Sequence, residues 1–422
     1  MKYLIVAALL LWRAYDAHSQ PMPIVPGGKM DLRDLVAEAL YNNPEINAAV
    51  HQMSVMEARV AQAGALDDPE LEYMREEMPG FKWPDAMYSR LELTQMFRFP
   101  SKLSKQTELA QIEAEHAHHD HLEKMNEVLA SLKSSYYELW FVQQSIQLTQ
   151  ENARLLRQFT NVAQTKYGVG EVPQQDVLKA YVELAKIDNQ LIDLRQRELG
   201  AKAMLMATLN RQSKDTLGVA TLPDNIQFTP TLDTLQALAL EYRPMLLHDS
   251  LSVEESRMRL SLARKEFLPD FKLGLQYVTV PIGDFRGWSV RAGITLPFAP
   301  WTLGKANARV EEASASISRS KDQYTASRNM VASSIREFYF KAQASKRQIE
   351  TYRTSILPQA RQSLNASLTA YQNGRTDFLM LIDAYRTLVD LQMESLMTRM
   401  QFEQAVAELE RAVGIDGIAT LK

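Results

Sequence analysis

The sequence predicts a mostly α-helical, internally duplicated chain in which long coiled-coil-like helical hairpins are joined to a small β-sheet of four strands. One pattern of residues occurs twice, about 200 positions apart, and each copy holds a stretch of 67 residues almost free of glycine and proline. Two short segments of alternating apolar and polar residues precede each long stretch. A period of two is typical of strands, and long uninterrupted helical stretches are typical of coiled coils.

The duplication is visible in matched segments. Residues 35–44 match residues 235–244 at an offset of 200, and residues 93–97 match residues 294–298 at an offset of 201. The other matches join 69–73 to 269–273 at an offset of 200 and, at an offset of 204, Tyr167 to Tyr371 and Tyr181 to Tyr385. Chance similarity would not hold the offset nearly constant, so the pattern indicates a repeat.

The repeat sets the expected domain organisation. Residues 20–212 form the first repeat, residues 213–231 form a linker containing glycine and prolines, and residues 232–414 form the second repeat. Residues 415–422 form a short C-terminal tail. Residues 1–19 resemble a secretory signal peptide, because a lysine and a short apolar run precede small residues at a possible cleavage site; a short N-terminal anchor is the alternative.

The long stretches are expected to be coiled-coil helices. Residues 101–167 contain no glycine or proline, and 67 residues at 1.5 Å each would extend about 100 Å. Residues 305–371 are interrupted only by Pro358, which should kink the helix. Apolar residues recur at alternating spacings of three and four, which predicts a packing seam. The seam residues of the first repeat are Leu122, Met125, Leu129, Leu132, Tyr136, Leu139 and, after the polar position Gln143, Ile146. Those of the second repeat are Val331, Ile335, Phe338, Ala342, Ser345, Ile349, Tyr352 and Ile356.

Four strands are expected, at about 69–78 and 88–97 in the first repeat and at about 269–279 and 287–298 in the second. In the second repeat one face of each strand is apolar and the other is polar or glycine, and the first repeat has a weaker version. This is the length and period of a transmembrane strand with lipid on one side and water on the other. A half-buried sheet in a soluble domain is the alternative.

Four strands are too few to close a barrel, and open sheet edges are not tolerated in lipid. The smallest membrane barrels have about eight strands. If the strands do cross a membrane, the chain must share its sheet with copies of itself. No other stretch of the mature sequence is long and apolar enough to be a transmembrane helix.

Composition excludes several functions. A net charge of -4 offers no basic field for phosphate, so no nucleic-acid partner is expected. The absence of cysteine excludes disulfides, thiolate metal sites and a lipidated N-terminal cysteine. There is no glycine-rich phosphate loop and no G-x-S-x-G or H-E-x-x-H motif, so neither an enzyme nor a cofactor is expected.

Several local motifs, in this order, resemble the TolC family of outer-membrane efflux factors. They are 167–170 with 176–180 in the first repeat, and 356–360, 370–374, 381–388 and 408–414 in the second. The resemblance implies a homotrimer with a twelve-stranded transmembrane β-barrel above an α-helical barrel. It also implies a passive channel in the outer membrane of a Gram-negative bacterium, in contact with lipid and extending into the periplasm. The implied partners of this channel are a periplasmic adaptor protein and an inner-membrane RND-type pump.

Residues 94–102 are similar to the strand-to-helix junction of the CzcC-like branch of this family, which implies heavy-metal cations as cargo. That branch usually has glycine before the lysine, whereas Ser101 precedes Lys102 here; Gly304 and Lys305 keep the pair in the second repeat. The alternatives are the same duct serving drugs or secreted proteins, or a soluble periplasmic coiled-coil scaffold.

Turn residues should end one long helix and begin the next in each repeat. The resemblance implies that these hairpin tips lie at the periplasmic end and dock the adaptor. The tip residues are Gly168, Val169, Gly170 and Glu171 in the first repeat, and Asn373, Gly374 and Arg375 in the second.

The same resemblance implies an acidic gate just beyond the tips. Asp383 matches the aperture carboxylate of the family, and Asp176 matches an acid of the first repeat. A second carboxylate of the family is replaced by Met380. Arg386 lies one helical turn after Asp383 and could pair with it. A salt bridge on a solvated face is the alternative role of Asp383.

Four histidines stand close together within one predicted helix: His116, His118, His119 and His121. On a helix His116 and His119 share one face, as do His118 and His121, so either pair could hold a borderline metal ion. A solvated polar face on the outside of the helical barrel is the alternative.

Overall fold

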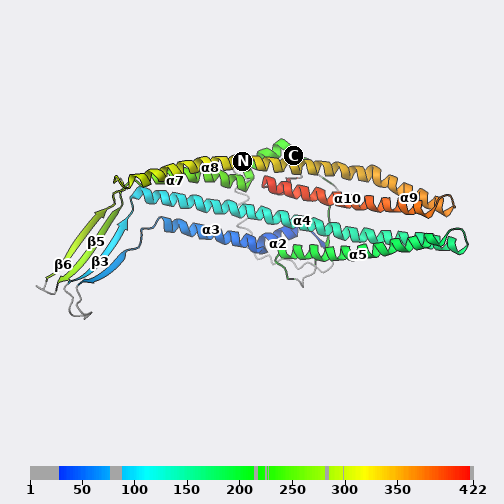
Figure 1. Ribbon diagram of the computed structural model, residues 1–422, viewed down its shortest axis with the longest axis horizontal. Helices are drawn as coiled ribbons and strands as arrows, with labels where there is room; N and C mark the ends of the chain where they lie inside the picture. The colour runs from blue at the N-terminus through cyan, green and yellow to red at the C-terminus, as the bar shows by residue number, and fades with distance from the viewer. Residues whose placement is uncertain are drawn as a thin grey trace. The chain divides into compact units, whose positions relative to one another are not determined.

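A computed structural model describes residues 28–76, 88–212, 217–223, 226, 228–280, 285–297 and 299–418. The predicted signal peptide, the expected strand ends at 77–78 and 298, parts of the linker and the end of the tail lie outside these residues. The chain divides into two compact units, and each takes segments from both repeats. Figure 1 labels the helices and strands and colours them by residue number. Unit 1 consists of Met1–Asn47, Met125–Leu232 and Ile335–Lys422, and unit 2 of Ala48–Lys124 and Asp233–Ser334.

Unit 2 contains an antiparallel sheet of four strands in the order β2-β3-β5-β6. The strands are β2 (Glu70–Glu76), β3 (Tyr88–Phe97), β5 (Phe271–Val280) and β6 (Phe285–Ile294). Each repeat supplies one hairpin, and β3 pairs with β5 where the two hairpins meet. The prediction of four strands in a mostly helical chain is confirmed.

Unit 2 also contains most of the helix α3 (Pro44–Ala63), the helix α7 (Pro244–Lys265) and the first parts of the helices α4 (Pro100–Gly168) and α8 (Leu303–Thr351). A shorter helix, α6 (Leu232–Tyr242), precedes α7. Helix α4 runs through 69 residues without interruption, as the absence of helix breakers predicts.

Unit 1 contains α2 (Leu32–Asn42), α5 (Gln174–Thr208), α10 (Phe378–Val413), α9 (Leu357–Gln372) and the remaining parts of α4 and α8. Two apolar clusters form its core. The first joins α2, α4, α5 and α10 around Tyr136 and Leu205, and the second joins the α4–α5 and α9–α10 hairpins.

A short parallel pair in unit 1, β1 (Lys29–Met30) with β4 (Val219–Ala220), was not predicted. It lies beside the polar interruption in the α4 seam, where the Gln143 side chain accepts a hydrogen bond from the Ala220 N–H (2.9 Å). The linker is therefore tied to the first repeat through backbone groups that sequence periodicity does not report.

The irregularity expected at Pro358 is a five-residue π-helix, η4 (Tyr352–Ile356), between α8 and α9. Proline has no N–H, and its ring would clash with the carbonyl four residues before it. In the wider turn just before Pro358, the Leu357 N–H donates to the Tyr352 carbonyl, five positions earlier. None of the helices in the described ranges combines the length and apolarity needed to cross a bilayer.

Candidate functional site

The sheet of unit 2 has one exposed apolar face. Leu71, Leu93, Leu273 and Val290, one from each strand, are 45–79% exposed on this face. Trp288 stands on the same face and is 69% exposed. A continuous apolar surface shared by four strands is larger than the scattered exposed residues of a soluble domain, and it marks a surface that meets lipid or another protein.

The opposite face of the sheet is polar. Arg291 donates to the Glu92 carboxylate (2.9 Å) and to the Gln276 side chain (3.1 Å), and Nε of Arg90 lies 3.5 Å from the Glu92 carboxylate. Glu92 is only 4% exposed, so these partners compensate its burial. The cluster crosses from β3 over β5 to β6 and therefore links the hairpins of the two repeats.

At the corner where the sheet meets the helices, one acidic side chain joins the two repeats. Asp270, just before β5, lies 2.9 Å from the Lys102 ammonium at the start of α4 and accepts a hydrogen bond from the Phe99 N–H (2.9 Å). Lys102 is 8% exposed. The segment 94–102, which the sequence associates with cargo, thus serves in this structure as a structural joint.

The tips of the two hairpins in unit 1 end in the same way. Gly170 and Gly374 have φ of +79° and +68°, a backbone conformation that favours glycine. The next residues, Glu171 and Arg375, donate their N–H groups to carbonyls five positions back. This is the hydrogen bonding of a glycine-terminated helix, and it explains the turns. All seven predicted tip residues are exposed.

Beneath the tips the two hairpins meet around Tyr371. This side chain is 1% exposed, contacts the Phe378 ring at a tilt of 59°, and has Lys166 of the other hairpin 5.9 Å from its ring centre. Burial, together with the charge of Asp176, raises the pKa of Tyr371 to about 12. Burial and the nearby Asp377 raise the pKa of Asp176 above its usual range.

The structure corrects one part of the gate prediction, the partner of Arg386. Arg386 does not bond to Asp383; its guanidinium donates to both carboxylate oxygens of Glu183 on α5, at 3.3 Å from Nε and more closely from Nη2. Glu183 lies 203 positions earlier in the chain. Although burial would raise the pKa of Glu183, the hydrogen bonds from Arg386 and Lys186 outweigh it and lower the pKa.

Asp383 and Met380 are both exposed on α10. The Asp383 carboxylate makes no hydrogen bond within the described part of the chain, and its charge adds to the effect of Glu183 in raising the pKa of Arg386. Asp383 is therefore available to solvent, while Arg386 fastens α10 to α5.

The predicted histidine cluster lies in unit 2, where α4 contacts α7. His116 lies 3.0 Å from Glu255, and its ring centre is 4.2 Å from that of His248. The contact with His116 lowers the pKa of Glu255 to about 2. His118 is exposed, and His121 is buried.

Burial lowers the pKa of the fourth histidine, His119. Across the described ranges no three histidine or carboxylate side chains converge as metal ligands. In this structure the histidine cluster joins α4 to α7. His248 and Glu255 of α7 belong to it, and the spacing of residues 116–121 could not predict them because they lie far away in the sequence.

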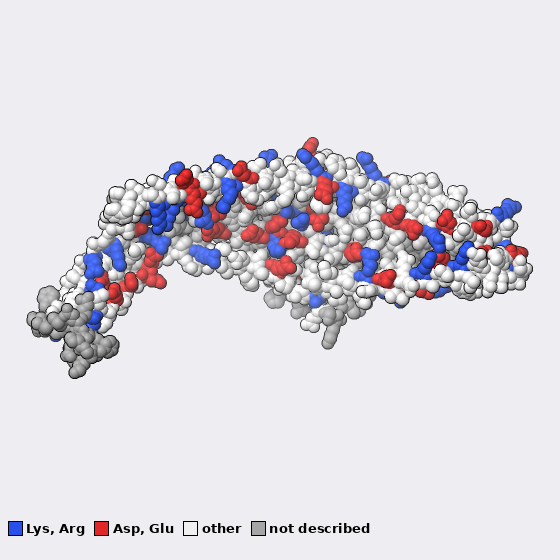
Figure 2. Space-filling view, in the orientation of Figure 1, with Lys and Arg blue, Asp and Glu red and all other residues white. Residues whose placement is uncertain are grey.

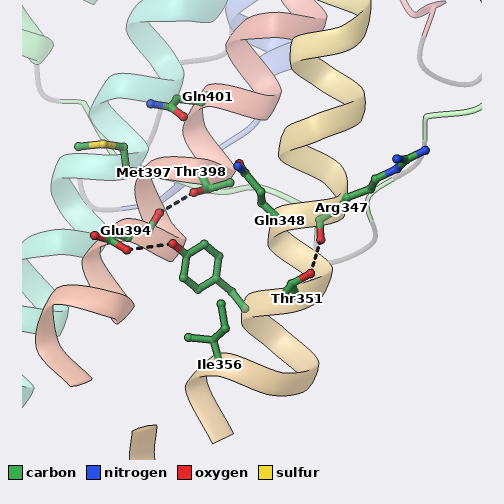
Figure 3. Close-up of a pocket in the computed structure, with 9 residues that line it drawn as sticks. Arg347, Gln348, Thr351, Ile356, Glu394, Met397, Thr398 and Gln401 are labelled. Carbon is green, nitrogen blue, oxygen red and sulfur yellow. Dashed lines mark hydrogen bonds between the residues drawn. The ribbon is translucent and has the colours of Figure 1, made fainter. Parts of the chain in front are cut away.

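Unit 1 also carries an open groove of about 540 Å³ beside the π-helix (Figure 3). Glu394 of α10 accepts a hydrogen bond from the Tyr352 hydroxyl (2.9 Å) at its wall. On the face shown in Figure 2, acidic and basic side chains are interspersed, and no extended area of one sign is seen there.

Sequence reasoning missed Glu183, Asp270 and the polar-face cluster of Glu92 and Arg291. Each belongs to a pair separated by 168 to 203 positions, so no local spacing could reveal it. The one available signal was a charged residue in an otherwise apolar periodic position, which Glu183 occupies between Ala180 and Ile187 on the buried face of α5.

Comparison with known proteins identifies the class. A family model described as outer membrane efflux protein matches the chain at residues 35–211 and again at 235–415. The chain therefore belongs to the outer membrane efflux protein family, whose members are export channels and not enzymes. The two matches agree with the internal duplication.

Among individual relatives, the chain is 22% identical to the cobalt-zinc-cadmium resistance protein CzcC of Cupriavidus metallidurans, over 94% of each chain. It superposes on crystal structures of CusC with a TM-score of 0.79 at 16% identity, covering 94% of this chain and 98% of that one. The outer membrane protein VceC of Vibrio cholerae gives a TM-score of 0.76 at 18% identity, covering 91% and 96%. These structural likenesses establish the fold.

Proposed function

We propose that this efflux channel is the passive outer-membrane duct of a tripartite exporter, formed by three copies of the chain and extending into the periplasm. The sheet carries the proposal: it has an exposed apolar face and a polar face, and the outer edges of β2 and β6 have no partner strand within the described chain. Such edges need partners in lipid. Three copies would supply twelve strands, enough for a water-filled barrel.

The exposed hairpin tips are the proposed docking site of a periplasmic adaptor. Their backbone is held by glycine-terminated turns, and a side chain added at Gly170 or Gly374 would meet no atom within 4 Å. The tip surface is thus ordered and unobstructed. An inner-membrane pump would supply the energy, since the sequence has no nucleotide-binding motif.

Heavy-metal cations are the proposed cargo. The similarity to a protein named for cobalt, zinc and cadmium resistance over 94% of the chain supports this assignment. Deleting the gene should increase sensitivity to these metals, and the intact gene should restore tolerance. Unchanged metal tolerance with increased drug sensitivity would replace the metal cargo by drugs and leave the duct itself in place.

Asp383 is the proposed aperture carboxylate. Three exposed copies would form an acidic ring, which favours cations and can hold a multivalent one. In a planar bilayer the parent should show cation-selective conductance that added multivalent cations block. Asp383→Asn should weaken the block and leave the trimer intact. An unchanged block would assign Asp383 to a solvated surface role, and a parent protein without conductance would contradict the duct.

A further inference from the structure

The two hairpins of the sheet are paired in the same register. Leu71 on β2 lies opposite Leu93 on β3, and Phe271 on β5 lies opposite Ile294 on β6. Adding the sequence offsets of 200 and 201 to the first pair gives the second pair. The offsets found in the sequence therefore describe a structural equivalence, residue by residue.

The hairpins meet through one defined junction inside the chain. The outgoing strand of the first repeat, β3, pairs with the incoming strand of the second, β5, so that Gln95 lies opposite Leu273. Immediately beside this pairing, Lys102 binds Asp270 through both carboxylate oxygens (3.0 and 2.9 Å). Strand pairing and a shielded ion pair thus act at the same corner.

The residues that correspond to this ion pair at the outer edges of the sheet have no partner in the described chain. Lys305 is the counterpart of Lys102 in the second repeat, and Glu70 is the counterpart of Asp270 in the first. Both side chains are exposed, and neither side chain forms a hydrogen bond or ion pair with a residue that the structure describes. Glu70 is the first residue of β2, and Lys305 follows β6 near the start of α8; β2 and β6 are the two outer strands of the sheet.

The helical hairpins of unit 1 show the same asymmetry independently. Tyr371 and Tyr385 of the second repeat are 1% and 3% exposed, because they pack against the first repeat. Their counterparts, Tyr167 and Tyr181, are 45% and 48% exposed. The face that the second repeat buries inside the chain is therefore the face that the first repeat leaves open.

We infer that a second copy of this chain covers these surfaces by repeating the internal junction, with Lys305 bound to Glu70 of the partner copy. The outer strand β6 would extend onto β2 of that copy in the register carried over from β3 and β5. Gln95 opposite Leu273 becomes Leu296 opposite Tyr73 of the partner. The inference rests on the proposed shared barrel and adds its residue pairing.

The geometry of such a contact favours a closed ring. One edge of each copy binds the other edge of the next, which is a head-to-tail interface, and such interfaces form rings when the rotation closes. Closure would leave no unpaired sheet edge.

Cysteine cross-linking tests the register, and the natural absence of cysteine makes every added thiol informative. Leu296→Cys combined with Tyr73→Cys should form a disulfide between copies, seen as covalent oligomers on a non-reducing gel. Leu296→Cys with Leu71→Cys, slipped by two residues on the same face, should cross-link at least tenfold less. Gln95→Cys with Leu273→Cys should cross-link within one chain and leave its mass unchanged. Stronger linkage in the slipped pair would overturn the register.

Charge reversal tests the ion pair. Lys305→Glu and Glu70→Lys should each lower the temperature at which the detergent-solubilised oligomer dissociates, with the helical circular dichroism of the chain retained. The double variant should restore the parent value. Failure of this rescue in a protein that remains trimeric would overturn the ion pair alone, whereas a monomeric parent would overturn the proposed trimeric duct as well.

Discussion

At positions that match between the repeats, the second repeat keeps its tyrosines inside the molecule and the first repeat exposes them. Tyr385 is 3% exposed and donates its hydroxyl to the Asn152 carbonyl (3.1 Å), whereas Tyr181 is 48% exposed. The lysine at the strand-to-helix corner shows the reverse, since Lys102 is buried and Lys305 is exposed.

The difference between the repeats follows from which neighbour each face meets. Within one chain the first repeat offers its β3 side to the second repeat, and the second repeat offers its β5 side in return. Each repeat therefore pairs one edge of its hairpin inside the chain. Its other edge, which corresponds to the edge that the other repeat pairs, stays free. Near-identical sequence patterns thus acquire opposite burial because of position in the chain, and matched substitutions in the two repeats should have unequal effects.

The corner acids should show the largest inequality. Asp270→Asn removes the counter-charge of the buried Lys102 but keeps an oxygen for the Phe99 N–H. Leaving a buried charge without its partner should reduce the free energy of unfolding by about 3 kcal/mol. Denaturant unfolding followed by helical circular dichroism measures this loss.

The matched control for that experiment is Glu70→Gln. Because Glu70 is exposed and has no partner in the described chain, this variant should change the unfolding midpoint much less. Equal losses in the two variants would contradict the distinction between an internal and an external corner.

The matched tyrosines should show a smaller inequality. Tyr385→Phe removes one buried hydrogen bond, and the free energy of unfolding should fall by about 1 kcal/mol. Tyr181→Phe removes an exposed hydroxyl that accepts a hydrogen bond from Gln164. Because water can replace a bond at an exposed site, the effect should be close to zero. If Tyr181→Phe lowers the free energy of unfolding of the detergent-solubilised monomer as much as Tyr385→Phe does, the two matched positions are energetically equivalent, and the comparison between the repeats is wrong.

The Arg386 contact should have a modest effect on stability and a clear local effect. Arg386 is about half exposed, so solvent screens its pair with Glu183, and Arg386→Ala should cost about 0.5 kcal/mol. The start of α10 would be less tightly fastened to α5, so its amides should exchange faster with deuterated water. Val182→Ala, at the matched position of the first repeat, is the control and should leave exchange in α10 unchanged.

The π-helix should contribute least to stability. Pro358→Ala restores an N–H and removes the steric cause of the wider turn, so α8 and α9 should join into one regular helix. Opposing changes in packing and helix propensity should keep the net effect within about 0.5 kcal/mol. A structure of the variant that still contains the π-helix would show that packing around Tyr352, not proline, maintains it.

Local chemistry accounts for much of what could be predicted. The absence of helix breakers between residues 101 and 167 predicts α4, and the period of two in the strands predicts their apolar and polar faces. The positions of Gly170 and Gly374 predict the turns, because the left-handed backbone there favours glycine. These properties depend only on residues close in sequence.

The sequence by itself therefore determined the helices, the strand faces, the turns and the duplication, since each is set by the covalent chain and its local periodicity. Only the tertiary structure decided that Arg386 binds Glu183 instead of Asp383, that Lys102 binds Asp270, and that Tyr385 is buried where Tyr181 is not. The physical reason is distance along the chain: these partners lie on different elements, and their pairing depends on which faces the fold brings together.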